Sequence, residues 1–107
     1  MEKKDRLFIS IYNDYYGSLL TQYQRRLIDG YYNLDMSLSE LAEENNISPQ
    51  GVRDALKRAE KQLIAYEEKL GLAKKSERIK SIIEEVMQES DEEQREKLNK
   101  IIDILVE

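Results

Sequence analysis

The sequence predicts an all-α protein, and three observations support this fold class. Helix-forming residues such as Leu, Glu, Lys and Gln dominate a chain of 107 residues that contains only one Pro and four Gly. Apolar residues recur at spacings of three and four over most of the chain, as on one face of a helix. Ser, Thr or Asp stands before several of these stretches, where a helix needs a capping side chain.

Two helices are expected in the N-terminal part. The first carries a stripe ended by Gly17, where a left-handed stop residue fits, and the stripe is Leu7, Phe8, Ile11, Tyr12 and Tyr15. Thr21 and Gln24 have the spacing of a capping box, so the second helix begins there and ends near Asn33. Its inward residues are Tyr23, Leu27, Ile28 and Tyr31.

A short helix and a long helix follow. Ser37 and Glu40 repeat the capping-box spacing, and Asn45-Asn46 ends the short helix because Asn tolerates left-handed geometry. Ser48 is a strong N-cap and Pro49 suits the first helical position. The long helix then runs to a stop at Gly71 with an apolar seam of Val52, Leu56, Ala59, Leu63, Tyr66 and Leu70.

The C-terminal part predicts a helical hairpin extension, residues 73–107, after a first domain of residues 1–72. A short joint, residues 72–75, precedes a stripe of Ile79, Ile82, Ile83, Val86 and Met87. Residues 90–93 read as a break with an N-cap, and the next stripe is Leu98, Ile101, Ile102 and Leu105. One-sided stripes must be buried, so these and the seam of the long helix suggest a homodimer.

The stretch from Leu38 to Lys57 has the order of a helix-turn-helix motif. Small or apolar residues stand where the second helix must cross the first, and they are Leu41, Ala42, Ile47, Val52 and Ala55. The opposite side of the long helix carries side chains that can reach base edges and phosphates, namely Gln50, Arg53, Asp54, Lys57, Arg58 and Lys61. The alternative is an ordinary solvated face supported by pairs such as Asp54 with Arg58.

These features resemble the YlxM-like family of helix-turn-helix proteins over about residues 5–72. The residues that carry the resemblance are Leu19-Leu20-Thr21, Gln24-Arg25, Tyr31-Tyr32, Asp35, Ser37-Leu38-Ser39-Glu40-Leu41-Ala42-Glu43-Glu44, Ser48, Gln50, Val52, Asp54, Lys57-Arg58, Glu60, Tyr66-Glu67 and Lys69-Leu70. The resemblance implies a small bacterial protein linked to the signal recognition particle pathway, because genes of this family neighbour those of its GTPases. It therefore implies signal recognition particle components as partners.

Residues 37–63 also look like the last helical region of bacterial sigma factors, which reads the upstream promoter element. This similarity implies a sigma-factor-like helix-turn-helix bundle and favours DNA over RNA as the ligand. Pro49 and Arg53 depart from the pattern, which has a basic and an aromatic residue there, so the base-reading details do not carry over.

Composition excludes several other classes of function. The chain has no His and no Cys, its four glycines are isolated, and adjacent glutamates on a helix point about 100° apart. We therefore expect no enzyme activity, no cofactor and no metal. No apolar run approaches a membrane span, and the charged residues 1–6 do not open a leader, so the expected location is cytoplasmic without membrane insertion.

A protein-interaction adaptor remains an alternative to nucleic-acid binding. The net charge is −5, and residues 67–107 carry most of the excess, with 8 basic and 12 acidic residues. On this hypothesis the acidic hairpin binds a basic partner and the helix-turn-helix is a scaffold. Six tyrosines could stack on bases, but their helical spacing favours packing, and they are Tyr12, Tyr15, Tyr16, Tyr23, Tyr31 and Tyr32.

Overall fold

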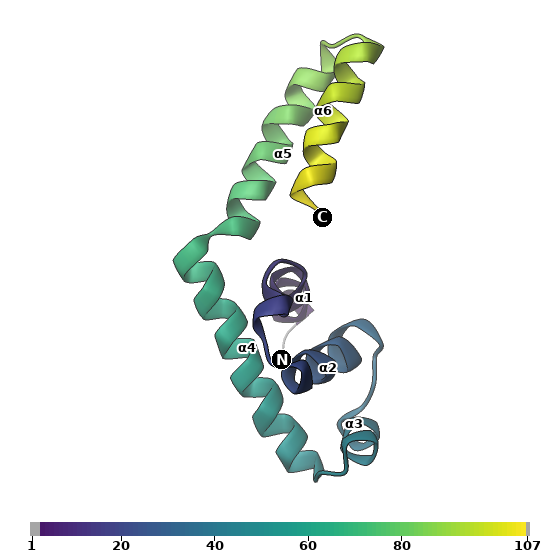
Figure 1. Ribbon diagram of the computed structural model, residues 1–107, viewed down its shortest axis with the longest axis vertical. Coiled ribbons are helices and arrows are strands. Elements are labelled where there is room, and N and C mark those ends of the chain that lie inside the picture. The colour runs from purple at the N-terminus through teal and green to yellow at the C-terminus, as the bar shows by residue number, and fades with distance from the viewer. Residues whose placement is uncertain (1–2, 107) are drawn as a thin grey trace. The chain divides into compact units, whose positions relative to one another are not determined.

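The computed structural model describes residues 3–106 (Figure 1). Residues 1 and 2 of the charged N-terminal stretch and residue 107 of the C-terminal extension lie outside the described residues. Within residues 3–106 there are six α-helices and no strand, which confirms the all-α prediction. The helices are α1 Lys3–Tyr16, α2 Gln22–Ile28, α3 Leu38–Asn45, α4 Pro49–Leu70, α5 Leu72–Gln88 and α6 Glu92–Leu105. None of these helices has the length and apolar character needed to cross a membrane.

The chain forms two compact units, residues 1–71 and residues 72–107. In the first unit α1, α2 and α3 all pack against the long helix α4 (Figure 1). In the second unit α5 and α6 pack against each other as an antiparallel hairpin. The first unit buries its apolar residues between α4 and the other helices, whereas in the described part of the second unit Ile83 is the buried apolar residue.

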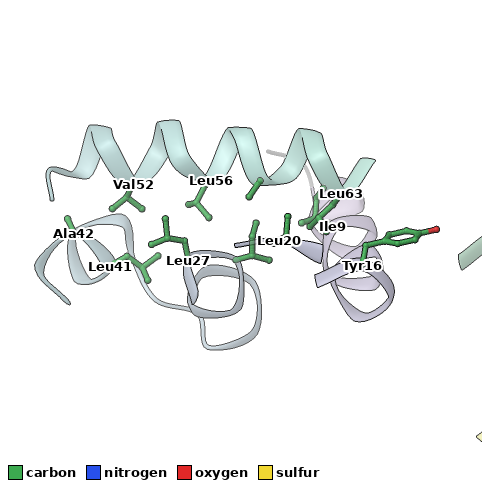
Figure 2. Close-up of a cluster of buried hydrophobic side chains, with 11 residues drawn as sticks. Ile9, Tyr16, Leu20, Leu27, Leu41, Ala42, Val52, Leu56 and Leu63 are labelled. Carbon is green, nitrogen blue, oxygen red and sulfur yellow. The ribbon is translucent and has the colours of Figure 1, made fainter. Parts of the chain in front are cut away.

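The core of the first unit lies between α4 and the three shorter helices (Figure 2). The seam predicted for the long helix is buried from Val52 to Leu63, and the rest of the core comes from the other elements. The buried apolar residues of this cluster are Ile9, Tyr16, Leu20, Leu27, Ile28, Leu41, Ala42, Val52, Leu56, Ala59 and Leu63. Helices of the same unit thus cover the seam from Val52 to Leu63, whereas Leu70 at its end is 46% exposed. The homodimer stays a prediction.

Local capping chemistry sets the helix starts as predicted. The Thr21 hydroxyl accepts from the Gln24 backbone N–H at 3.1 Å, and the Gln24 side chain accepts from the Thr21 backbone N–H at 3.1 Å. Ser37 and Glu40 form the same reciprocal box at 3.0 and 3.1 Å. The predicted break at residues 90–93 contains a third box, in which Asp91 caps α6 together with Gln94.

Gly17 does not act as a left-handed stop, so that prediction is wrong. It begins a 3₁₀ turn, Gly17–Leu19, and the positive φ among the described glycines belongs to Gly71. A Cβ atom on Gly17 would overlap the Asn13 side-chain oxygen and lie 3.3 Å from Arg25 Nε. Close approach of side chains, and not backbone handedness, therefore favours glycine here.

The second helix ends at Asn33 as predicted, but its last turn is widened. After α2 the chain continues as a π-helical turn, η2, over Asp29–Asn33. Gly30 lies in this turn, and a Cβ atom there would come within 2.7 Å of Leu41 Cδ2. The wide turn therefore lies directly against the first helix of the helix-turn-helix motif.

The predicted joint at residues 72–75 is also wrong, because α5 starts at Leu72. Gly71 is left-handed, with φ 63° and ψ 26°, and its N–H donates to the Glu67 carbonyl at 2.8 Å. One left-handed residue suffices to end α4, and the good helix formers Leu72, Ala73, Lys74 and Lys75 then continue as helix.

Candidate nucleic-acid interface

A tight turn of defined geometry joins the two helices of the motif. Asn46 is left-handed, with φ 56° and ψ 42°, and the Ile47 N–H donates to the Ala42 carbonyl at 3.0 Å. Ser48 then caps α4 by accepting from the Gly51 N–H at 3.0 Å. These bonds satisfy the Ala42 carbonyl near the end of α3 and the Gly51 amide in the first turn of α4, so residues of the turn itself stabilise its geometry.

The two helices cross where the sequence provides small side chains. Ala42 is 5% exposed and lies beside Val52, which is fully buried, at the start of α4 (Figure 2). Leu41 is buried, and Ile47 and Ala55 are partly buried against the same core. A larger residue at position 42 would separate the helices, so packing explains why the motif needs alanine there.

The six predicted contact residues all lie on one exposed face of α4, which we call the α4 outer face. With about 100° of rotation per residue, this face is centred opposite the seam of Val52, Leu56 and Leu63. Its members are Gln50, Arg53, Asp54, Lys57, Arg58 and Lys61, each of which is exposed. The structure thus brings the candidate residues together, and whether they contact nucleic acid remains a prediction.

The cations of this face are free of ion pairs within the part of the chain that the structure describes. The carboxylate of Asp54 accepts a hydrogen bond from the Gln50 side-chain amide at 3.0 Å. The Asp54 carboxylate forms no ion pair with Arg58. Among the described residues, ion pairs within 4.0 Å join Arg6 to Asp35 and Arg25 to Asp29. The Asp54–Arg58 pair of the alternative interpretation is therefore not formed.

Charge is unevenly distributed along the motif. The exposed surface of α3 is acidic, with Glu40, Glu43 and Glu44, and Asp54 adds a carboxylate in the first turns of α4. The basic residues Lys57, Arg58 and Lys61 lie further along α4. Attraction for phosphate is therefore concentrated in the second to fourth turns of α4 and is weak near the turn of the motif.

Glu60 borders the α4 outer face, and its role was not predicted. It is 9% exposed, and its Oε2 accepts a hydrogen bond of 2.8 Å from Tyr32 Oη in η2. Burial raises the pKa of Glu60 above its ordinary value, although the Tyr32 hydrogen bond and Lys57 act in the opposite direction. Burial and the same hydrogen bond raise the pKa of Tyr32. Glu60 follows Leu56 by four residues, a spacing that could have indicated its position beside the seam.

Arg6 extends this cluster to α1. Its guanidinium carbon lies 4.7 Å from the centroid of the Tyr31 ring and 4.9 Å from that of Tyr32. It also donates to the Tyr31 carbonyl at 3.0 Å. The cation therefore holds α1 against η2, and η2 in turn holds α4 through Glu60.

The tyrosines pack within the first unit, as their spacing predicts. Tyr16 is 1% exposed and donates a hydrogen bond of 2.6 Å to Glu67 Oε1 on α4. The others are partly buried against the core, and they are Tyr12, Tyr15, Tyr23, Tyr31, Tyr32 and Tyr66. These rings stabilise the position of α4 and do not form a continuous stacking surface.

The capped short helix, the left-handed turn, the buried crossing and the exposed second helix together define a helix-turn-helix protein. Comparison with known families agrees with this class: the model described as "UPF0122: Putative helix-turn-helix protein, YlxM / p13 like" matches residues 1–103. The chain therefore belongs to the UPF0122 family, which confirms the YlxM-like resemblance. The family description names no enzymatic activity.

Curated relatives show the same similarity. A UPF0122 protein of Desulforamulus reducens is 54% identical over 77 residues, which cover 71% of this chain and 66% of the relative. A second one, of Caldanaerobacter subterraneus, is 51% identical over 82 residues, covering 77% of this chain and 70% of its own length. A third, of Clostridium perfringens, is 48% identical over 86 residues, which cover 80% of this chain and 77% of the relative. The matches thus span about two-thirds to three-quarters of these relatives.

Proposed function

We propose that this protein is a regulatory nucleic-acid-binding protein of the signal recognition particle pathway, with duplex DNA preferred over RNA. The observation that carries the proposal is the α4 outer face, where exposed cations without ion pairs lie on the second helix of a helix-turn-helix motif. That helix is the one which enters the major groove in proteins of this class. The pathway is suggested by the YlxM-like resemblance and by family membership.

The charge pattern indicates how the helix would meet DNA. Lys57, Arg58 and Lys61 suit phosphate contacts, while Gln50 and Arg53, nearer the start of α4, suit base edges. The 3.0 Å hydrogen bond between Gln50 and Asp54 orients both side chains and leaves Gln50 Oε1 and Asp54 Oδ2 available for contact with a base. With four cations on the face, affinity should be moderate and sensitive to salt.

Fluorescence anisotropy with the full chain tests the proposal. Labelled duplex DNA of mixed sequence and the RNA of the signal recognition particle are titrated at about 50 mM and about 200 mM salt. We expect binding that weakens as salt rises and that is tighter for DNA. Absence of salt-sensitive binding to both nucleic acids would refute the proposal, and tighter binding to the RNA would refute the preference for DNA.

Single substitutions connect the binding to the α4 outer face. Lys57→Ala and Arg53→Ala should each weaken binding by roughly three- to tenfold, as expected for the loss of one charged contact. The matched control is Lys69→Ala, because Lys69 is an exposed cation on the same helix eight residues beyond Lys61. A loss with Lys69→Ala equal to that with Lys57→Ala would mean that net charge, and not this face, governs binding.

An adaptor function is the second candidate, and one observation on the hairpin favours it. Exposed carboxylates lie seven residues apart on α5, at Glu77 and Glu84, and at Glu92, Glu96 and Asp103 on α6. Helical rotation places both sets on the same side of an antiparallel hairpin. We call this the acidic face. Lys100 lies among the α6 carboxylates by the same rotation, so these six residues together carry a charge of −4, which suits a basic protein partner.

The two candidates predict opposite results for one variant of the full chain. Neutralising the five carboxylates of the acidic face to Gln or Asn should leave DNA binding unchanged or slightly stronger if the α4 outer face acts. It should abolish capture of signal recognition particle proteins if the adaptor function is correct. Capture that survives neutralisation would refute the adaptor function.

A further inference from the structure

The hairpin has more apolar surface than its two helices cover. Along α5, Ser76 and Ile83 are buried and Met87 is partly buried, and on α6 the partly buried residues are Leu98, Ile102 and Leu105. These residues recur at spacings of three, four and seven, so on each helix they share one side, and α5 and α6 contact each other. Other apolar residues of α5 and α6 lie outside this buried side and are exposed.

A second apolar surface lies beside this contact. On α5, Ile79 is 40% exposed, Ile82 60% and Val86 48%, and on α6, Ile101 is 44% and Ile104 64% exposed. On each helix these exposed residues are rotated in the same sense away from the buried side chains. Because α5 and α6 are antiparallel, the exposed residues of both helices then lie on the same side of the hairpin. We call this side the apolar face, and it lies opposite the acidic face.

Charges flank the apolar face of α5 symmetrically about Ile82. Lys75 stands seven residues before Ile82, and Glu89 stands seven residues after it. Arg78, four residues before Ile82, and Glu85, three residues after it, have the same order of charge without being symmetric about Ile82. All four side chains are exposed; the cations lie in the first half of α5, Glu85 lies in its second half, and Glu89 stands one residue after its end.

We propose that the apolar face binds a second copy of this chain, with α5 packed antiparallel to α5 of the other copy about a two-fold axis at Ile82. This arrangement brings Lys75 of each copy opposite Glu89 of the other and buries Ile79, Ile82 and Val86. A parallel pairing would place like charges opposite each other. Two hairpins joined in this way make a four-helix bundle, which closes the apolar face on both copies.

Disulfide cross-linking tests the axis directly, because the natural sequence has no cysteine. In the full chain, Ile82→Cys places two thiols at the two-fold axis and should give a covalent dimer in high yield under mild oxidation. The control is Ser81→Cys, since Ser81 is exposed on another side of α5. Equal yields for the two variants, or no dimer with Ile82→Cys, would overturn the proposal.

Charge exchange tests the register independently. Lys75→Glu and Glu89→Lys should each weaken dimerisation by roughly three- to thirtyfold in equilibrium sedimentation, since each dimer contains two such pairs. The double variant restores opposite charges and should recover the dimer to near the original affinity. A monomeric natural protein at about 50 μM, or a double variant no better than the singles, would contradict the arrangement, and circular dichroism checks that every variant keeps its helices.

Discussion

Tyr32 Oη donates a hydrogen bond of 2.8 Å to Glu60 Oε2, and this bond joins the π-helical turn to the middle of the long helix. Glu60 is nearly buried, so its carboxylate depends on this donor for the interactions that water would otherwise provide. The bond therefore helps to fix the helix whose other side carries the candidate nucleic-acid contacts.

Replacing Glu60 by Gln should change how stability depends on pH. The pKa of Glu60 is raised in the folded protein, chiefly by burial. Because the pKa of Glu60 is higher in the folded than in the unfolded state, its contribution to stability is fully present below the unfolded-state pKa. This contribution is lost as the pH rises through the folded-state pKa. We expect the unfolding free energy of Glu60→Gln minus that of the natural protein to increase from about pH 4 to about pH 7. Urea unfolding followed by circular dichroism measures it, and a constant or decreasing difference would contradict the prediction.

Removing the Tyr32 hydroxyl should destabilise the protein. Tyr32→Phe leaves the buried carboxylate of Glu60 without this donor, so we expect a loss of about 1–3 kcal/mol at neutral pH. In a Glu60→Gln background the same change should cost less, because a neutral amide is easier to bury. A double-mutant cycle by urea unfolding gives the coupling, and a cycle with zero coupling energy would show that the bond has no role in stability.

Two glycines within helical segments should respond to alanine differently. In Gly30→Ala the new Cβ atom meets Leu41 Cδ2 at 2.7 Å in a fully packed region, so we expect a loss of about 1–3 kcal/mol. In Gly51→Ala the nearest atom is Ser48 Oγ at 3.3 Å, at an exposed cap, so we expect a change within about 0.5 kcal/mol. Thermal and urea unfolding compare the two, and an equal response would mean that packing around Gly30 is looser than described.

The left-handed turn of the motif makes a further prediction. Asn46→Ala should destabilise the protein by about 1 kcal/mol, because alanine adopts φ 56° less readily than asparagine. Asn46→Gly should be nearly neutral, since glycine occupies this region without a Cβ penalty. Unfolding measurements on both variants check the geometry, and an alanine variant as stable as the glycine variant would argue against a left-handed residue here.

Helix starts and the buried seam could be predicted from the sequence because both depend on nearby residues. Capping boxes at Thr21 and Ser37 involve residues three apart, and the seam from Val52 to Leu63 follows helical periodicity. Gly17 was misassigned because its role depends on the side chains that surround it, namely Asn13 one helical turn earlier and Arg25 on α2, and not on its own backbone conformation. The π-helical turn was also missed, and Gly30 within it lies close to Leu41 of another helix.

The candidate interface was predictable in position but not in its surroundings. Periodicity places Arg53, Lys57 and Lys61 on the side of α4 opposite the seam, and the structure confirms their exposure. Its spacing from Leu56 indicates that Glu60 lies beside the seam, but its hydrogen bond with Tyr32, 28 residues earlier in the chain, could not be predicted from local patterns. The sequence also predicts an Asp54–Arg58 pair as an alternative, whereas Asp54 accepts a hydrogen bond from Gln50 in the structure.

The salt dependence of DNA binding by a variant of the α4 outer face tests the central claim most directly. Lys57, Arg58 and Lys61 are replaced together by Gln, and the slope of log affinity against log salt is measured by anisotropy for both proteins. We expect a natural slope no steeper than about −4 and a variant slope shallower by about two to three, since each lost phosphate contact removes about 0.9. An unchanged slope in the triple variant would show that this helix face does not contact the nucleic acid.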